Sequence, residues 1–208
     1  MIISSLLLCI SAGCGDKSLT DELVSGGQGL GLQGDESEIQ AGSSYVENEV
    51  FQKKSGKIPT LSELKENVKE ELGNHYWPEV SISKKDLEEK TGITEDMYVE
   101  FLAEEQVMES NIDMMIIIRA KEDYVGVIEQ ALEEYREHLI EDNQKYPQNL
   151  SKAKASRMET IENYICFVQL GADTSIVADK GEREIISYCQ EENERAIDIL
   201  EKCILQSL

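Results

Sequence analysis

Positive charge is scarce in this 208-residue sequence, which has 20 Lys and Arg against 42 Asp and Glu and a net charge of -22. A protein that follows a phosphate backbone needs a basic surface, so this balance argues against nucleic acid as a partner. No apolar run approaches the roughly 20 residues that a membrane-spanning helix requires. The length suits one folded domain with further residues left over, and the 40% of hydrophobic residues is enough for its core.

The sequence is also poor in the side chains that catalytic motifs combine. His75 and His138 have no second His or Cys at metal-ligand spacing, and we find no nucleophile elbow, phosphate-binding loop or calcium loop. We therefore predict no catalytic residue, no metal site and no cofactor. His75 is expected to pack within an aromatic loop and His138 to lie on a solvated helix surface. Cys166, Cys189 and Cys203 are predicted to be free buried thiols.

The chain begins with a short apolar stretch that ends in small residues and a cysteine, Ala12-Gly13-Cys14. This order is typical of a secretory signal. It resembles the lipobox of bacterial lipoproteins, in which cleavage leaves the cysteine as a lipid-modified N-terminus, although Ser11 departs from that pattern. We predict a signal segment over residues 1–14 and lipid attachment at Cys14. The alternative is a buried N-terminal element with an incidental cysteine.

Residues 15–58 contain eight of the 14 glycines, together with many Ser, Gln, Asp and Glu residues. Such a segment buries too little apolar surface to offset its ordering entropy, so we predict a disordered acidic linker with a reach of about 35–40 Å. The linker holds four basic and eight acidic residues, which leaves -18 on residues 59–208. Most of the acidity therefore belongs to the predicted folded domain, 59–208.

Helical and strand periodicities alternate over that domain. A capping box at Thr60 and Glu63 opens the first predicted helix, and the helices together cover residues 60–72, 83–91, 121–142 and 182–205. Strands are predicted in two pairs, 97–104 with 112–120 and 158–161 with 164–170; Glu162 and Asn163 form a hairpin turn in which Asn takes a positive φ. The order α-α-β-β-α-β-β-α predicts an α+β fold, a two-layer antiparallel sheet of about four strands with helices.

Three short segments carry a resemblance to a known family: Gly92–Asp96, Asn111–Asp113 leading into Met115–Lys121, and Tyr146–Pro147. In their order and spacing, residues 68–173 resemble a family of small surface lipoproteins from Gram-positive anaerobic bacteria that share a domain of unknown function, DUF4358. None of these segments is a catalytic signature. The resemblance implies a lipid-anchored surface domain and transfers no activity and no site residue.

The predicted central strands are apolar on both faces. If the helices at 121–142 and 182–205 cover one face only, the other face needs a second cover. We expect the helix at 60–72 to supply this cover, since it must dock its own Leu stripe. Otherwise the uncovered patch is a candidate interaction surface that includes Met115, Ile117 and Phe167.

These features predict a membrane-tethered, extracytoplasmic lipoprotein at the cell membrane with a non-enzymatic binding function. Its expected partner, besides the membrane reached through the lipid, is another envelope protein or a cationic ligand. The alternative is an envelope hydrolase that uses a carboxylate pair, for which Glu104–Glu105 and Glu191–Glu192 are among the adjacent candidates. The identity of the partner and the oligomeric state stay open.

Overall fold

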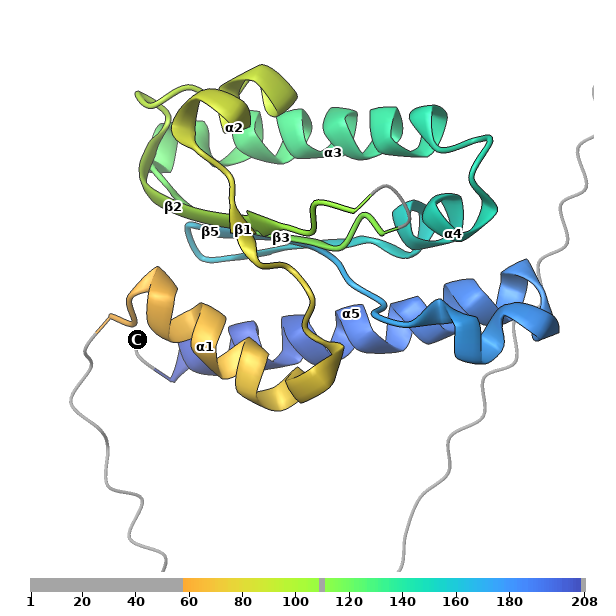
Figure 1. Ribbon diagram of the computed structural model, residues 1–208. Helices are drawn as coiled ribbons and strands as arrows, with labels where there is room; N and C mark the ends of the chain where they lie inside the picture. The colour runs from red at the N-terminus through yellow and green to blue at the C-terminus, as the bar shows by residue number, and fades with distance from the viewer. Residues whose placement is uncertain (1–57, 109–110, 207–208) are drawn as a thin grey trace, which may run out of the picture. The chain divides into compact units, whose positions relative to one another are not determined.

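The computed structural model describes residues 58–108 and 111–206. The predicted signal segment, Cys14 and the predicted linker up to residue 57 lie outside the described residues. A five-stranded antiparallel sheet, with strand order β1-β2-β3-β5-β4, forms the centre of the described domain (Figure 1).

The described residues form five α-helices and five strands. The helices are α1 (Leu61–Leu72), α2 (Lys84–Thr91), α3 (Val125–Asp142), α4 (Pro147–Ala155) and α5 (Glu182–Leu205). The strands are β1 (Val80–Ser81), β2 (Tyr98–Glu105), β3 (Met114–Ala120), β4 (Arg157–Ile161) and β5 (Tyr164–Gln169). The predicted α+β class and antiparallel sheet are confirmed, while β1 and α4 are elements that the sequence patterns did not predict.

Local capping chemistry sets the helix boundaries. The Thr60 hydroxyl accepts the Glu63 N–H at 3.2 Å and the Glu63 carboxylate accepts the Thr60 N–H at 2.8 Å, which confirms the capping box. Gly92 ends α2 in the left-handed region, with a φ of 74°. Pro147 begins α4, where its missing N–H removes no helical hydrogen bond. Tyr146-Pro147 therefore starts a further helix after α3 has ended at Asp142.

The β4–β5 hairpin turn differs from its prediction in one detail. The positive φ, 57°, belongs to Glu162 and not to Asn163. Asn163 instead bonds the end of β3: its carbonyl accepts the Ala120 N–H at 2.8 Å, and its side-chain amide donates to the Ala120 carbonyl at 3.2 Å. This pairing ties the hairpin turn to the central strand.

Helices cover both faces of the sheet, with α2 and α3 on one face and α1 and α5 on the other (Figure 1). The prediction placed the helices at 121–142 and 182–205 on the same face, and the structure separates them. Ile128 and Leu132 of α3 pack with Ile116 on one face. The opposite face is buried by α1 and α5 through a shared set of apolar side chains: Leu61, Leu64, Val68, Leu72, Ala196, Ile197, Leu200 and Ile204.

Candidate functional site

The structure corrects the predicted interaction surface. The side chains of Met115, Ile117 and Phe167 are all fully buried. Met115 and Ile117 lie under α1 and α5, whereas Phe167 pairs with Ile116 and faces α3, so the three residues do not share one face. The helix predicted at 60–72 supplies the cover, because its apolar stripe packs on the face that would otherwise be open.

The predicted hydrolase carboxylates are separated by the fold. Residues next to each other on a strand point to opposite faces, and Glu104 bonds Lys65 and Tyr76 while Glu105 bonds Lys90. On α5, Glu192 is buried and Glu191 is exposed. Neither adjacent pair therefore presents two carboxylates to one substrate.

The two histidines lie in separate settings. His75 is 46% exposed, with its Nδ1 atom 3.2 Å from the Glu192 carboxylate. His138 is 73% exposed, with its Nδ1 atom 3.9 Å from Glu141, on the solvated surface where it was expected. Within residues 58–108 and 111–206, no three His, Cys, Asp or Glu side chains are grouped to hold a metal ion.

Cys166, Cys189 and Cys203, the three cysteines within the described residues, are free thiols. Burial raises the pKa of the Cys166 and Cys189 thiols to about 12, so both are protonated at neutral pH and are poor nucleophiles. Cys203 is only half-buried, which differs from the prediction, and its sulfur accepts a hydrogen bond from the Asn67 side-chain amide at 3.4 Å.

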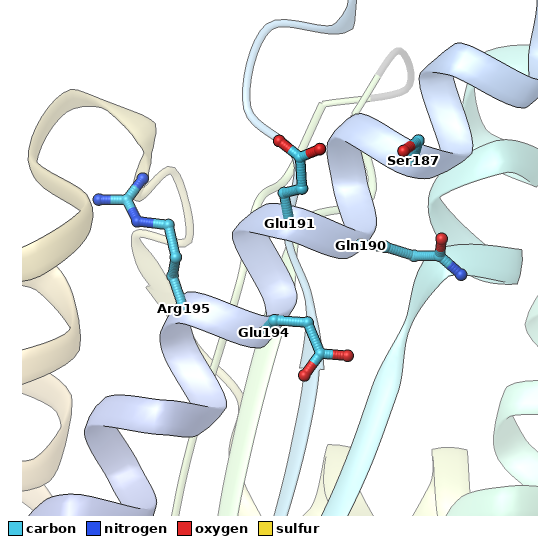
Figure 2. Close-up of a pocket in the computed structure, with 5 residues that line it drawn as sticks. All are labelled: Ser187, Gln190, Glu191, Glu194 and Arg195. Atoms are coloured by element: carbon cyan, nitrogen blue, oxygen red, sulfur yellow. The ribbon is translucent and has the colours of Figure 1, made fainter.

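A surface hollow of about 630 Å³ follows the outer face of α5. Its lining residues recur at helical spacing, and Figure 2 shows their side chains along the helix: Ser187, Gln190, Glu191, Glu194 and Arg195. Glu194 is paired with Arg157 at 3.1 Å and Arg195 with Glu71 at 3.4 Å. The carboxylates of Glu191 and Glu194 are exposed, so neither lies in the apolar setting typical of a general acid for glycoside hydrolysis.

A second hollow, of about 370 Å³, lies beside the N-terminus of α1 and the outer edge of β2. We name it the β2-edge groove, and its lining is drawn from three segments: residues 60–62, 81–82 and 100–103. The groove exists because β1 is only two residues long and pairs with β2 only at Glu104 and Glu105. The chain leaves the sheet after Ile82, whose N–H donates to the Ala103 carbonyl at 2.9 Å.

The backbone of β2 is open along this groove. Alternate residues of an antiparallel strand direct both their N–H and C=O groups to the same side, and Ala103 directs its carbonyl to β1. Phe101 therefore directs its N–H and C=O to the same outer side, where the described residues provide no strand beside it. A β-bulge between Tyr98 and Glu100 further disturbs the start of this edge, and Val99 is 53% exposed there.

The third feature is a group of buried polar side chains at the N-terminal end of β3, just before Met114. We name it the Lys152 cluster: Lys152 from α4 with Asn111 and Asp113 from the segment before β3. The Lys152 Nζ donates to Asn111 Oδ1 at 2.7 Å, to Asp113 Oδ1 at 2.5 Å and to the Ala172 carbonyl at 2.9 Å. The Lys152 and Asp113 side chains are 3% and 0% exposed. The Lys152 amine therefore lies within hydrogen-bond reach of both an amide and a carboxyl group, and all three side chains are buried.

Residues around the Lys152 cluster contact Asp113 and Lys152, whereas one amide nitrogen of Asn111 has no hydrogen bond. The second carboxylate oxygen of Asp113 accepts the Ala172 N–H at 3.1 Å, and the Trp77 ring lies 5.7 Å from the ammonium. Burial raises the pKa of the Asp113 carboxyl above its usual value, against the opposing effect of Lys152. The Asn111 Nδ2 is buried and has no hydrogen-bond partner.

The Lys152 cluster was not predicted from the sequence. Asn111–Asp113 stood out only as part of a family pattern, and no periodicity predicted α4, the helix that carries Lys152. The sequence shows an apolar strand preceded by Asn111 and Asp113. This pattern does not indicate that Lys152, 39 residues away, reaches the Asp113 carboxylate. Only the packing of α4 against α5 and β5 brings these side chains together.

The fold and these sites define an α+β domain with a helical layer on each face of an antiparallel sheet. Residues 71–170 match the profile of a protein family described as "Domain of unknown function (DUF4358)", so the chain carries a DUF4358 domain over these residues. The match includes β1 to β5 and all three members of the Lys152 cluster, and it ends before α5. No curated protein and no solved structure matches the chain. No helix among the described residues is long and apolar enough to cross a membrane.

Proposed function

We propose that the protein is a lipid-anchored, extracytoplasmic binding domain that takes up an extended, positively charged segment of another envelope protein along the β2-edge groove. The observation that carries the binding function is the uncovered edge of β2. A segment that lies beside Phe101 continues the sheet where β1 stops, and its backbone pairs with the outward N–H and C=O groups.

Side chains next to the open edge suit an extended peptide. Val99 is exposed and Leu102 lines the groove, so alternate side chains of an added strand find apolar contacts at this edge. The groove also contains Glu100, whose carboxylate bonds the Arg119 guanidinium at 2.8 Å on the sheet side. Backbone pairing supplies affinity for any extended chain, and the side-chain contacts select among such chains.

Charge favours a cationic partner. The region from residue 59 onward has a net charge of -18, which attracts Lys- and Arg-rich segments and repels acidic ones. The anchoring part of the proposal rests on the Ala12-Gly13-Cys14 order and on the acidic, glycine-rich composition that follows it. A tether of that composition gives the domain reach to segments of neighbouring envelope proteins.

Hydrogen exchange with two matched peptides tests the binding function. The full chain is mixed with a short peptide in which Lys alternates with Val, and separately with one in which Glu alternates with Val. We expect the Lys peptide to slow exchange at the Phe101 amide, because a new backbone hydrogen bond forms there, and the Glu peptide to have no such effect. The Val99→Lys substitution should weaken the response by charge repulsion.

The control substitution is Val127→Lys on α3, since Val127 is similarly exposed but lies away from the groove. It should leave the response unchanged. Equal protection by both peptides, or protection that appears outside β2, would show that charge-selected pairing at this edge does not occur. The anchor is tested separately by acyl labelling, which should be lost in Cys14→Ser.

A further inference from the structure

The Lys152 cluster holds an amine against a carboxamide, which are the two reactants of an amide-forming transfer. The Lys152 Nζ donates to Asn111 Oδ1 at 2.7 Å, and this hydrogen bond keeps the nitrogen next to the Cγ atom that bears Oδ1. Close, fixed approach of this kind replaces a bimolecular encounter and removes much of the entropic part of a reaction barrier. The Asn111 Nδ2, which would be the leaving group, is not held by any hydrogen bond.

We propose that Lys152 and Asn111 form an intramolecular isopeptide bond and that Asp113 transfers the protons. The proposal does not depend on the function of the β2-edge groove. It assigns a chemical role to a buried polar group that the binding function leaves unused.

The attacking amine must be neutral, and the cluster provides a route to that state. Asp113 Oδ1 lies 2.5 Å from the Lys152 Nζ. Two opposite charges in a site that excludes water are costly to keep, so transfer of one proton from the ammonium to the carboxylate removes both charges. The direction of the Asp113 pKa, which burial raises, agrees with this transfer.

The reaction then balances without any co-reactant. The Lys152 Nζ forms a bond to the Asn111 Cγ, and the protonated Asp113 donates its proton to Nδ2. Asp113 next takes a proton from the newly bonded Nζ, and the bond between Cγ and Nδ2 breaks. One ammonia leaves, no atom is oxidised or reduced, and Asp113 ends protonated as it began. Burial of the three side chains keeps water from competing with the amine.

The product would fasten α4 to the segment before β3. Lys152 and Asn111 are 41 positions apart in the chain, so the bond would close a long loop that includes β3 and α3. A covalent link across such a loop restricts the unfolded chain more than the folded one.

Peptide mass spectrometry of the full chain tests the proposal directly. Trypsin should release Thr91–Arg119, which contains Asn111, joined to Tyr146–Lys154, because an acylated Lys152 is no longer a cleavage site. The joined peptide should weigh the sum of the two minus one ammonia, and its fragments should place the link at Asn111 and Lys152. Unjoined peptides from the folded wild-type chain would overturn the proposal. Loss of one water with the link at Asp113 would overturn the assignment to Asn111.

Substitutions supply the controls. Asp113→Asn keeps the shape of the side chain but cannot carry the proton, so the linked peptide should be lost while circular dichroism still reports a folded chain. Lys152→Met should also abolish the link. Lys154→Arg, on the exposed side of the same helix, should leave it intact. A link that persists at full yield in Asp113→Asn would contradict the role given to Asp113.

Discussion

Two lysines on α4, two positions apart, occupy opposite environments. Lys152 is 3% exposed and pairs with the fully buried Asp113, whereas Lys154 is 39% exposed and pairs with Glu182, itself 55% exposed. Both ion pairs are short, at 2.5 and 2.6 Å. Distance alone therefore does not rank an ion pair. Removal of Asp113 leaves an unpaired charge in the interior, whereas removal of Glu182 leaves a hydrated charge at the surface.

The largest expected effect is at the buried pair. Asp113→Ala removes the carboxylate and, with it, the proton transfer that the Lys152–Asn111 link requires. An unlinked Lys152 then has only the Asn111 and Ala172 oxygens, so we expect the free energy of unfolding to fall by about 3–5 kcal/mol. Denaturant unfolding monitored by circular dichroism measures the change. Asp173→Ala is the control, because Asp173 is an exposed carboxylate that caps Ser175. A loss below about 1 kcal/mol for Asp113→Ala would remove the contrast between the two lysines.

An intermediate effect is expected at Gly171, which follows β5 and lies between Cys189 of α5 and Lys152 of α4. A methyl group on Gly171 would lie 2.5 Å from the Cys189 sulfur and 3.5 Å from the Lys152 Cε, so Gly171→Ala should destabilise the fold by about 1–3 kcal/mol. Cys189→Ala makes room for that methyl group. The double variant should therefore be more stable than the sum of the two single losses predicts, as measured by a double-mutant cycle. Strict additivity would show that this contact is not tight.

The smallest effect is expected at the exposed pair. Lys154→Ala removes a hydrated ion pair with Glu182 and places a good helix former in α4, so the free energy of unfolding should change by less than about 1 kcal/mol. Salt screens an exposed ion pair, so the difference in unfolding free energy between the wild type and the variant should become smaller as the salt concentration rises. A loss of unfolding free energy comparable to that of Asp113→Ala would mean that the exposed Lys154–Glu182 pair stabilises the fold as much as the buried pair does.

Elements with a clear apolar period could be predicted from the sequence. The Leu stripe and capping box of α1 and the long stripe of α5 gave both helices within a residue of their bounds. In contrast, α4 buries Asn149, Ser151 and Lys152, so its inner face reads as polar and its period is hidden. β1 has two residues, both exposed, which is too short for any alternation to show.

The candidate sites depend on strand order and packing, which no local pattern contains. Val99 and Phe101 border a free edge only because β2 lies next to a two-residue strand. Similarly, the burial of Lys152 depends on Asp113 and on the contact of α4 with α5. The one misplaced site, the Met115 patch, came from the assumption that two long helices share a face of the sheet.

The helices α1 and α5, which cover one face of the sheet, lie mostly outside the residues that match DUF4358. The DUF4358 match starts at residue 71, where α1 is almost complete, and ends at residue 170, before α5 begins. A chain trimmed to the matched residues would keep all five strands but would expose the apolar face of the sheet around Met115 and Cys166 to water. In this chain, the flanking helices α1 and α5 therefore complete the core of the matched segment.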